Sequence, residues 1–191
     1  MDDMAPSSPS SASSPSSLRL FLALWPDDAV RAQLRAWRDL WTWPRGAAPV
    51  DTAKLHLTLH FLGSVPSDRL PDLLDGFALP FAPFELQLGR PEVWHNGIAV
   101  LAPHAVPQAL LDLHAGLSQS LQDLGLQAEE RAYRPHVTMA RRAREAILPQ
   151  DGPEIAWRAD RYALVESRPG VGYTVLREYP SASSSTGVRA P

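Results

Sequence analysis

Hydrophobic and polar residues alternate strictly over the first seven residues of the stretch LHLTLHFLG, residues 55–63. The leucines up to position 59 fall on one parity, and His56, Thr58 and His60 fall on the other. Successive side chains of a strand point to opposite faces. The stretch therefore predicts an amphipathic strand whose polar face carries two histidines and a threonine. Such a strand is ordinary by itself, so its meaning depends on the rest of the chain.

Three other segments have apolar residues three and four positions apart, which is the spacing of an amphipathic helix. Asp27 or Asp28 can cap the first helix and Ser67 the second. The third carries five leucines on one face and ends at Gly125. We expect helices in the segments 27–41, 67–77 and 106–125.

Strands are expected between the helices. The run LRLFLALW, residues 18–25, is mainly apolar, as in a buried strand, and FELQLG alternates. Asn96-Gly97 and Pro169-Gly170 each separate two apolar runs and predict hairpin turns. Because hairpins join antiparallel strands, we expect an α+β fold with two mostly antiparallel sheets and flanking helices, arranged as two similar lobes.

Composition narrows the class of protein. The chain has 191 residues, of which 45% are hydrophobic, enough for one domain or two small lobes. Its net charge of −3 provides no general attraction for nucleic acid, so an anionic ligand needs a local basic cluster. The lack of cysteine excludes disulfides, thiolate zinc sites and cysteine nucleophiles. No apolar run is long enough to span a bilayer, and we expect a soluble, cytoplasmic protein.

Both ends of the chain are rich in serine and proline and have little apolar surface to bury. We expect disordered tails at residues 1–17 and 180–191. The segment 18–179 is then a single folded domain.

The stretch RPHVTMARR, residues 134–142, repeats the pattern of the first motif. HLTL at 56–59 and HVTM at 136–139 share one order: histidine, apolar, threonine, apolar. Within a strand, the histidine and the threonine of each motif point the same way, roughly 6–7 Å apart. Two such strands lining one site would bring together four polar side chains: His56, Thr58, His136 and Thr138.

This set of side chains is suited to acid–base chemistry on a phosphate. Two imidazoles with pKa values near 6.5 can hold opposite protonation states around neutral pH. One can take a proton from water while the other gives one to a leaving oxygen, each worth on the order of 10²–10⁴ in rate. Two threonine hydroxyls can donate hydrogen bonds to the phosphate oxygens. The chemistry requires no metal and no cofactor.

The two HxTx motifs, 80 residues apart, resemble those of the 2H phosphoesterase superfamily. The wider sequence is similar to the bacterial and archaeal RNA 2′,3′-cyclic phosphodiesterases, also called 2′-5′ RNA ligases. The similar stretches are LRLFLALWPDD, KLHLTLHFLG, PFELQLG, YRPHVTMARR and YALVESRPG, which follow in order through nearly all of residues 18–179. The resemblance implies a bilobal, pseudo-twofold fold whose motif strands face each other across a central cleft.

The resemblance also implies a reaction and residue roles. The reaction is metal-independent hydrolysis of a 2′,3′-cyclic phosphate at an RNA end to a 2′-phosphomonoester, with 2′-5′ ligation as its reverse. In that family the first-motif histidine is the proton donor and the second the proton acceptor, which map to His56 and His136. Thr58 and Thr138 would contact the phosphate. The residues by themselves do not assign acid and base.

Basic residues flank both motifs. Arg134, two residues before His136, is the first candidate for a guanidinium that binds the substrate phosphate, and Arg141 is the second. Lys54 lies two residues before His56 and could meet an RNA phosphate or be a solvated lysine at a strand end.

Other side chains near the motifs have two readings each. His60 shares the parity of His56, so it either edges the same face or is a satisfied polar side chain. The two would lie roughly 13 Å apart on a strand, too far to share a metal. Tyr133, Trp94 and Phe61 could stack on a base, although aromatic residues near strands more often belong to the core.

Two other functions stay open. The same residues could act on a small cyclic or 2′-5′-linked nucleotide, or the fold could be a non-catalytic module that binds RNA or phosphate. A pure binder has no need for two titrating histidines, which favours the enzyme. We expect a monomer whose partner is RNA with a 2′,3′-cyclic phosphate terminus.

Overall fold

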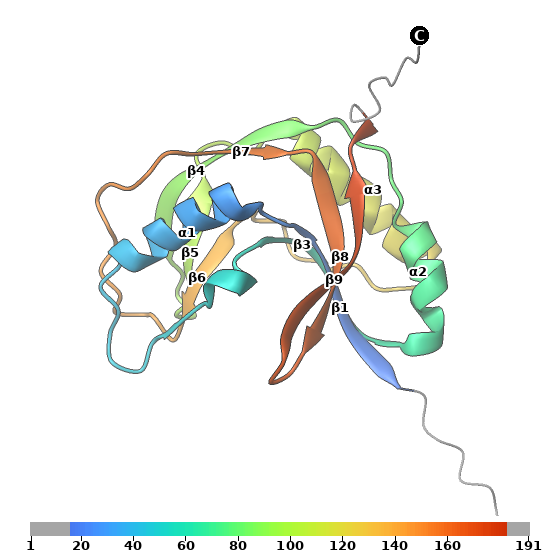
Figure 1. Cartoon of the computed structure of the whole chain (residues 1–191), viewed down its shortest axis with the longest axis horizontal. Coiled ribbons are helices and arrows are strands. Elements are labelled where there is room, and N and C mark those ends of the chain that lie inside the picture. The colour runs from blue at the N-terminus through green and yellow to red at the C-terminus, as the bar shows by residue number, and fades with distance from the viewer. Residues whose placement is uncertain (1–15, 183–191) are drawn as a thin grey trace, which may run out of the picture.

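The computed structural model describes residues 16–182, which form one curled antiparallel sheet and three α-helices (Figure 1). Most of the two predicted tails lies outside the described residues. The helices are α1 (Asp28–Leu40), α2 (Leu70–Gly76) and α3 (Gln108–Asp123), with short 3₁₀ turns η1 (Thr52–Lys54) and η2 (Ser67–Arg69). None of these helices is both long enough and apolar enough to cross a membrane.

Nine strands make the sheet, and every registered pair is antiparallel. The strands are β1 (Ser17–Leu24), β2 (Ala48–Pro49), β3 (Leu57–Pro66), β4 (Phe84–Val93), β5 (Ala99–Pro103), β6 (Val137–Arg141), β7 (Ile155–Ala159), β8 (Arg161–Arg168) and β9 (Gly172–Pro180). Their order is β7-β4-β5-β6-β3-β1-β8-β9, and β2 pairs with β6.

The two halves predicted from the sequence are present, but the expectation of two separate sheets is wrong. One half consists of β3, β1, β8 and β9, and the other of β6, β5, β4 and β7. They join where β3 pairs with β6, through the single registered pair Leu57 and Val137. These two residues lie within the two HxTx motifs, so backbone pairing between the motifs themselves joins the two halves into one sheet.

The helices begin where the local sequence allows. Asp27 caps α1, its carboxylate accepting a hydrogen bond from the Val30 N–H at 2.8 Å. The predicted Ser67 cap is wrong, because Ser67 lies in η2 and its hydroxyl pairs with that of Ser16 at 2.7 Å. Pro71 accounts for the difference, since a proline without an N–H suits the first turn of a helix that begins at Leu70.

Each long helix lies against the half of the sheet to which its preceding strand does not belong (Figure 1). Helix α1 follows β1, yet its Trp37 indole donates to the Pro153 carbonyl at 2.6 Å, just before β7. Helix α3 follows β5, yet its His114 carbonyl accepts from the His60 imidazole of β3 at 2.9 Å. The helices therefore tie the halves together across a sheet junction that is only one registered pair wide.

The apolar run of β1 is buried on both faces, as its composition predicted. Leu20, Leu22 and Leu24 belong to the main core under the helices. Phe21 and Ala23 point the other way, into a smaller apolar cluster shared with β8. That second cluster supports the face of the sheet on which the first motif histidine lies.

Candidate active site

His56 stands immediately before β3, and its ring is held by its own backbone. Its Nδ1 lies 2.6 Å from the Lys54 carbonyl, and its Nε2 lies 3.0 Å from the Thr58 hydroxyl. A carbonyl oxygen can only accept a hydrogen bond, so Nδ1 carries the proton in the neutral ring. Nε2 is therefore the nitrogen left for chemistry, and it lies beside the threonine of the same motif.

His136 repeats this arrangement in the other half. It stands immediately before β6, and its Nδ1 lies 2.6 Å from the Arg134 carbonyl, again two residues back. The distance and the tautomer are the same as for His56. Two imidazoles held in the same way through Nδ1 thus both keep Nε2 as the unprotonated nitrogen of the neutral ring, and that of His56 accepts from the Thr58 hydroxyl.

The strand register brings the two motifs together. Leu57 is paired with Val137, and the charge of His136 contributes to lowering the pKa of His56, so the two motif histidines lie near each other. The sequence predicted that four polar residues converge. His56 contacts Thr58 and lies near His136, while the place of Thr138 beside them stays a prediction.

The surroundings of both histidines favour their neutral forms in the free protein. Burial lowers the pKa of His56 to about 4, and the positive charges of Arg31, His136 and Arg141 act in the same direction against the hydrogen bond to Lys54. Burial also lowers the pKa of His136, with the charges of Arg134 and Arg141 adding to the effect. Arg141 thus acts on both rings. The site is a local positive field in a chain whose net charge is −3.

Aromatic rings surround His56. The ring centroids of Phe21, Tyr173 and Trp25 lie 4.8, 5.5 and 5.8 Å from that of His56. The Arg31 guanidinium lies 5.1 Å from the Trp25 ring and donates to four backbone carbonyls, those of Pro26, Thr52, Ala53 and Leu55. Arg31 therefore fixes the turn that leads into His56. Sequence inspection missed this residue, because three of its four carbonyl partners lie 21–24 positions away along the chain.

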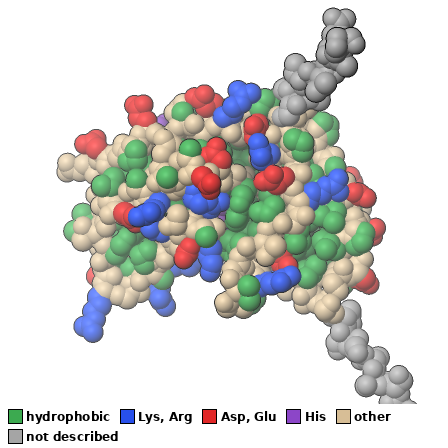
Figure 2. Space-filling model, viewed as in Figure 1, with side chains coloured by type: hydrophobic (Ala, Val, Ile, Leu, Met, Phe, Trp, Pro, Cys, Tyr) green, Lys and Arg blue, Asp and Glu red, His purple; other side chains and the backbone are tan. Residues whose placement is uncertain are grey.

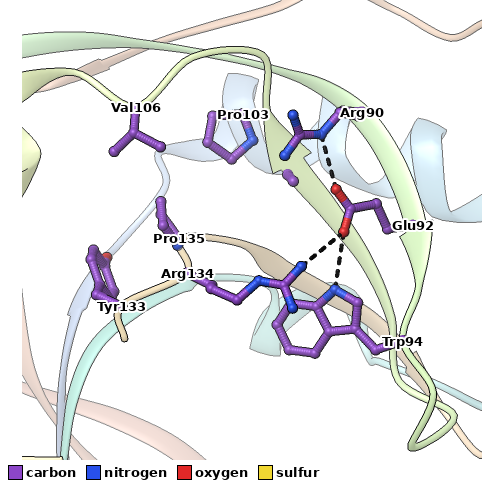
Figure 3. Close-up of a pocket in the computed structure, with 9 residues that line it drawn as sticks. Arg90, Glu92, Trp94, Pro103, Val106, Tyr133, Arg134 and Pro135 are labelled. Carbon is purple, nitrogen blue, oxygen red and sulfur yellow. Dashed lines mark hydrogen bonds and ion pairs between the residues drawn. The ribbon is translucent and has the colours of Figure 1, made fainter. Parts of the chain in front are cut away.

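The neighbours of His136 are different. The Trp94 ring centroid lies 4.5 Å from that of His136, and the Arg134 guanidinium lies 4.6 Å from the Trp94 centroid. The Glu92 carboxylate accepts from the Trp94 indole at 3.1 Å, from Arg134 at 3.3 Å and from Arg90 at 2.9 Å (Figure 3). Arg134, the first candidate for phosphate binding, is thus already paired with a carboxylate, while its backbone orients His136.

Comparison with known proteins decides the family. The sequence model described as the 2′-5′ RNA ligase superfamily matches residues 26–170. The chain belongs to this superfamily. It is 33% identical to the RNA 2′,3′-cyclic phosphodiesterase of Thermus thermophilus, over 85% of this chain and 89% of that protein. It is 29% identical to the Escherichia coli protein of the same name, over 84% and 95% of the two chains.

Solved structures of the 2′-5′ RNA ligase superfamily agree with the fold. The crystal structure of Escherichia coli LigT complexed with 3′-AMP is similar, with a TM-score of 0.79 and 27% identity over 87% of this chain and 99% of that chain. The structure of a Thermus thermophilus protein has a TM-score of 0.69 and 30% identity. The resemblance first indicated by the HxTx motifs is confirmed.

His60 lies on the opposite face from His56, contrary to the expectation from their shared parity. Leu22 pairs with His60, but the next residue of β1, Ala23, pairs with Thr58. This shift of register turns His60 toward the helices. There it is buried, stacks on His114 at 4.0 Å and lies 3.2 Å from the Ser118 hydroxyl. Of the two alternatives given by the sequence, the second is therefore correct: His60 is a buried polar side chain with hydrogen-bond partners and does not edge the face of His56.

The remaining predicted side chains divide between site and scaffold. Arg141, at the end of β6, is exposed. Lys54 lies in η1 with its ammonium 5.7 Å from the Tyr173 ring. Tyr133 stacks on His114 at 3.8 Å, so it packs against α3, and Phe61 is 51% exposed. Acidic and basic side chains are interspersed on the face shown in Figure 2, so positive charge at the motifs is a local feature.

Proposed function

We propose that this protein hydrolyses 2′,3′-cyclic phosphate ends of RNA to 2′-phosphomonoesters by acid–base catalysis with its two motif histidines. The observation that carries the proposal is a pair of imidazoles with matching Nδ1 hydrogen bonds. Each imidazole stands just before one of two strands, β3 and β6, that pair with each other. A phosphate-binding module does not need two histidines that are each held in one fixed tautomer.

The proposed step uses one histidine on each side of the phosphorus atom. His136 takes a proton from water through Nε2, and the water oxygen forms a bond to phosphorus. The bond from phosphorus to the ribose O3′ breaks, and protonated His56 gives its Nε2 proton to that oxygen. The 2′ bond remains, so the product is a 2′-phosphomonoester. No metal or cofactor is needed to balance this step.

Charge and hydroxyl groups would hold the phosphate. Thr58 and Thr138 can donate hydrogen bonds to its oxygens, and Arg141 supplies a positive charge that acts on both rings. We assign a weaker role to Arg134, because Glu92 already pairs with it.

The substrate itself changes the protonation of the acid. Burial holds the pKa of His56 at about 4 in the free protein, so little of it is protonated near neutral pH. A bound phosphate carries a negative charge, which favours the imidazolium and raises this pKa. The bell-shaped profile of kcat/KM should therefore have its maximum below pH 6.5, and the profile of kcat should extend to higher pH.

The relatives support the substrate class. The proteins from Thermus thermophilus and Escherichia coli are both RNA 2′,3′-cyclic phosphodiesterases by name. We therefore favour an RNA end over a small free nucleotide.

The test is incubation with a short RNA that ends in a 2′,3′-cyclic phosphate, in excess EDTA. Chromatography against 2′- and 3′-phosphate standards reads the product terminus. We expect a 2′-phosphate from the wild type and a loss of about 10²–10⁴ in rate for His56→Ala and for His136→Ala. His60→Ala is the matched control, because this third histidine of the same strand region faces the helices.

Four results would contradict the proposal. A 3′-phosphate product would overturn the assignment of the leaving oxygen. Undiminished activity in either motif variant would overturn the acid–base pair. A wild type that binds the RNA without converting it would favour the binding module, and conversion of mononucleotides alone would favour the small-nucleotide esterase.

A further inference from the structure

Three exposed arginines lie beside the end of β6. Arg142 and Arg144 follow Arg141, which is the last residue of this strand. Arg45 lies in the turn before β2, and β2 pairs with β6 through Ala48 and Arg141. We call Arg45, Arg142 and Arg144 the arginine rim.

Backbone hydrogen bonds hold the rim in place. Thr42 and Ile147 exchange two of them, at 3.3 and 3.0 Å, and Ala48 pairs with Arg141. The segment that carries Arg45 is thus fixed at both ends against the segment that carries the other two arginines. The rim is therefore a surface with a defined shape before any ligand binds.

The rim carries positive charge that the protein does not neutralise. Among residues 16–182, neither Arg141 nor any arginine of the rim forms an ion pair with a carboxylate. The Arg144 guanidinium donates to the His95 carbonyl at 2.9 Å, which leaves its charge in place. The exposed Glu145 next to it reduces the positive charge of this segment without cancelling it. Since the net charge of the chain is −3, the rim is a local basic region of the kind that a polyanionic ligand needs.

Arg142 has a backbone conformation that favours glycine. Its φ of 54° is the one positive value for a non-glycine residue within residues 16–182. The left-handed region brings a Cβ too close to the following carbonyl, so glycine or asparagine is the usual choice there. Residues held in such conformations cluster at functional sites. An exposed arginine in this place therefore indicates a role for its side chain.

An aromatic ring lies in the same segment as Arg45. Trp43 is half-buried and stacks on the buried Trp41, with ring centroids 5.1 Å apart and 3° between the planes. Proteins bind single-stranded RNA by combining a basic groove along its backbone with aromatic rings on which bases stack. The rim and Trp43 together provide both features.

The rim is continuous with the two-histidine site. Arg141 joins them, because it is adjacent to the rim in sequence and its charge contributes to lowering the pKa of both motif histidines. In the hairpin of β4 and β5, the Trp94 ring lies against His136. The Gly97 carbonyl of the same hairpin accepts from the Ala143 N–H at 2.8 Å, within the segment that carries the rim. An RNA whose cyclic phosphate lies at the histidines can therefore extend over the rim.

We propose that the arginine rim binds backbone phosphates of the RNA on the 5′ side of the cyclic phosphate. The inference rests on the proposed function, because it takes the RNA end as held at His56 and His136. A 2′,3′-cyclic phosphate lies at the 3′ end of a strand, so the strand can leave the site only in the 5′ direction. The rim takes no part in the bonds that form and break. It makes a single-stranded RNA of several nucleotides a better substrate than a dinucleotide.

The test compares two RNAs that end in the same 2′,3′-cyclic phosphate, a dinucleotide and an unstructured strand of twelve nucleotides. The ratio kcat/KM is measured for each at 50 and 200 mM salt with wild type, Arg142→Gly and Arg45→Ala. Arg142→Gly removes the guanidinium at a position where glycine fits the backbone, so the fold is retained. Arg158→Ala is the matched control, because it removes an exposed arginine from β7.

We expect wild type to have a higher kcat/KM on the longer RNA, and this value should fall with salt at a logarithmic slope of about −0.7 for each phosphate contact. Each rim variant should lower it about threefold to tenfold at 50 mM salt, and should make its fall between 50 and 200 mM about 2.5-fold smaller. On the dinucleotide, the rim variants should stay within about twofold of wild type, and Arg158→Ala should do so on both RNAs.

Four results would separate the rim from its alternatives. Equal kcat/KM for the two RNAs in wild type overturns the inference, as do rim variants that keep the wild-type values on the longer RNA. Equal losses on both RNAs would place these arginines at the reacting phosphate and overturn it too. So would a loss in Arg158→Ala as large as in the rim variants, because net charge alone would then act. A wild type inactive on both RNAs would instead overturn the proposed function.

Discussion

The two halves of the molecule present the same motif in different surroundings. His56 and His136 each stand one residue before a strand, and each donates through Nδ1 to the carbonyl two residues back, at 2.6 Å. Around His56 lie three aromatic rings and a turn fixed by Arg31. Around His136 lie a tryptophan, an arginine–carboxylate pair and an open pocket.

The difference shows how one template can serve two roles. The repeated backbone hydrogen bond sets the tautomer and leaves Nε2 unprotonated in both neutral rings. The neighbours then set what each Nε2 can do, because burial and nearby charge decide how readily a ring takes up a proton. The stronger effect on the pKa is at His56, where burial lowers it to about 4.

The largest expected contrast is in how much Arg31 and Arg134, the arginines beside the two motif histidines, contribute to the free energy of unfolding. Arg31 donates to four carbonyls of the protein, whereas Arg134 is 63% exposed and pairs with Glu92. Arg31→Ala leaves carbonyls of the turn before His56 without a donor and should lower the free energy of unfolding by about 2–4 kcal/mol. Arg134→Ala should cost less than about 1 kcal/mol. Urea denaturation measures both.

Arg31→Lys is the control for this contrast. It keeps the positive charge, but one ammonium cannot reach four carbonyls, so we expect an intermediate loss of stability. Equal, small losses for Arg31→Ala and Arg134→Ala would show that the turn before His56 does not depend on Arg31.

A smaller contrast concerns the dependence of stability on pH. The pKa of a buried neutral histidine is lower in the folded than in the unfolded chain, so the unfolded chain binds more protons below pH 6.5 and stability falls as the pH decreases toward the folded pKa. For His56, whose folded pKa is about 4, the loss is on the order of 1 kcal/mol between pH 6.5 and 5.

The variants His56→Gln and His136→Gln separate the two contributions. Urea denaturation at pH 5 and pH 7 should give a flatter pH dependence for His56→Gln than for His136→Gln. The reverse order would mean that the surroundings of His136 oppose the charged ring more strongly.

The local pattern of apolar and polar residues was enough to predict much of the fold and the pair of HxTx motifs. The N-terminal cap of α1, the apolar faces of α1 and α3 and the turns at Gly97 and Gly170, both with positive φ, are encoded within a few residues. The short strand β7 was overlooked, although its alternation of Ile155, Trp157 and Ala159 could have indicated it.

Features that depend on distant pairing could not be predicted in this way. The face of His60 is set by a register shift against β1, which parity within the stretch does not reveal. The joining of the halves into one sheet depends on the pairing of Leu57 with Val137, 80 residues apart. The contact between Glu92 and Arg134 spans 42 residues and appears only once β4 lies beside the segment before β6.

The most direct test of different roles for the two histidines uses a leaving group that needs no acid. A deoxynucleoside 3′-(4-nitrophenyl phosphate) releases nitrophenolate without protonation and is compared at neutral pH with the RNA 2′,3′-cyclic phosphate. If His56 is the acid and His136 the base, His56→Ala should keep its rate on the nitrophenyl ester within about tenfold of wild type, while His136→Ala loses about 10²–10⁴ on both substrates. Equal losses in both variants on both substrates would contradict that assignment. So would a near-normal rate on the nitrophenyl ester in His136→Ala but not in His56→Ala.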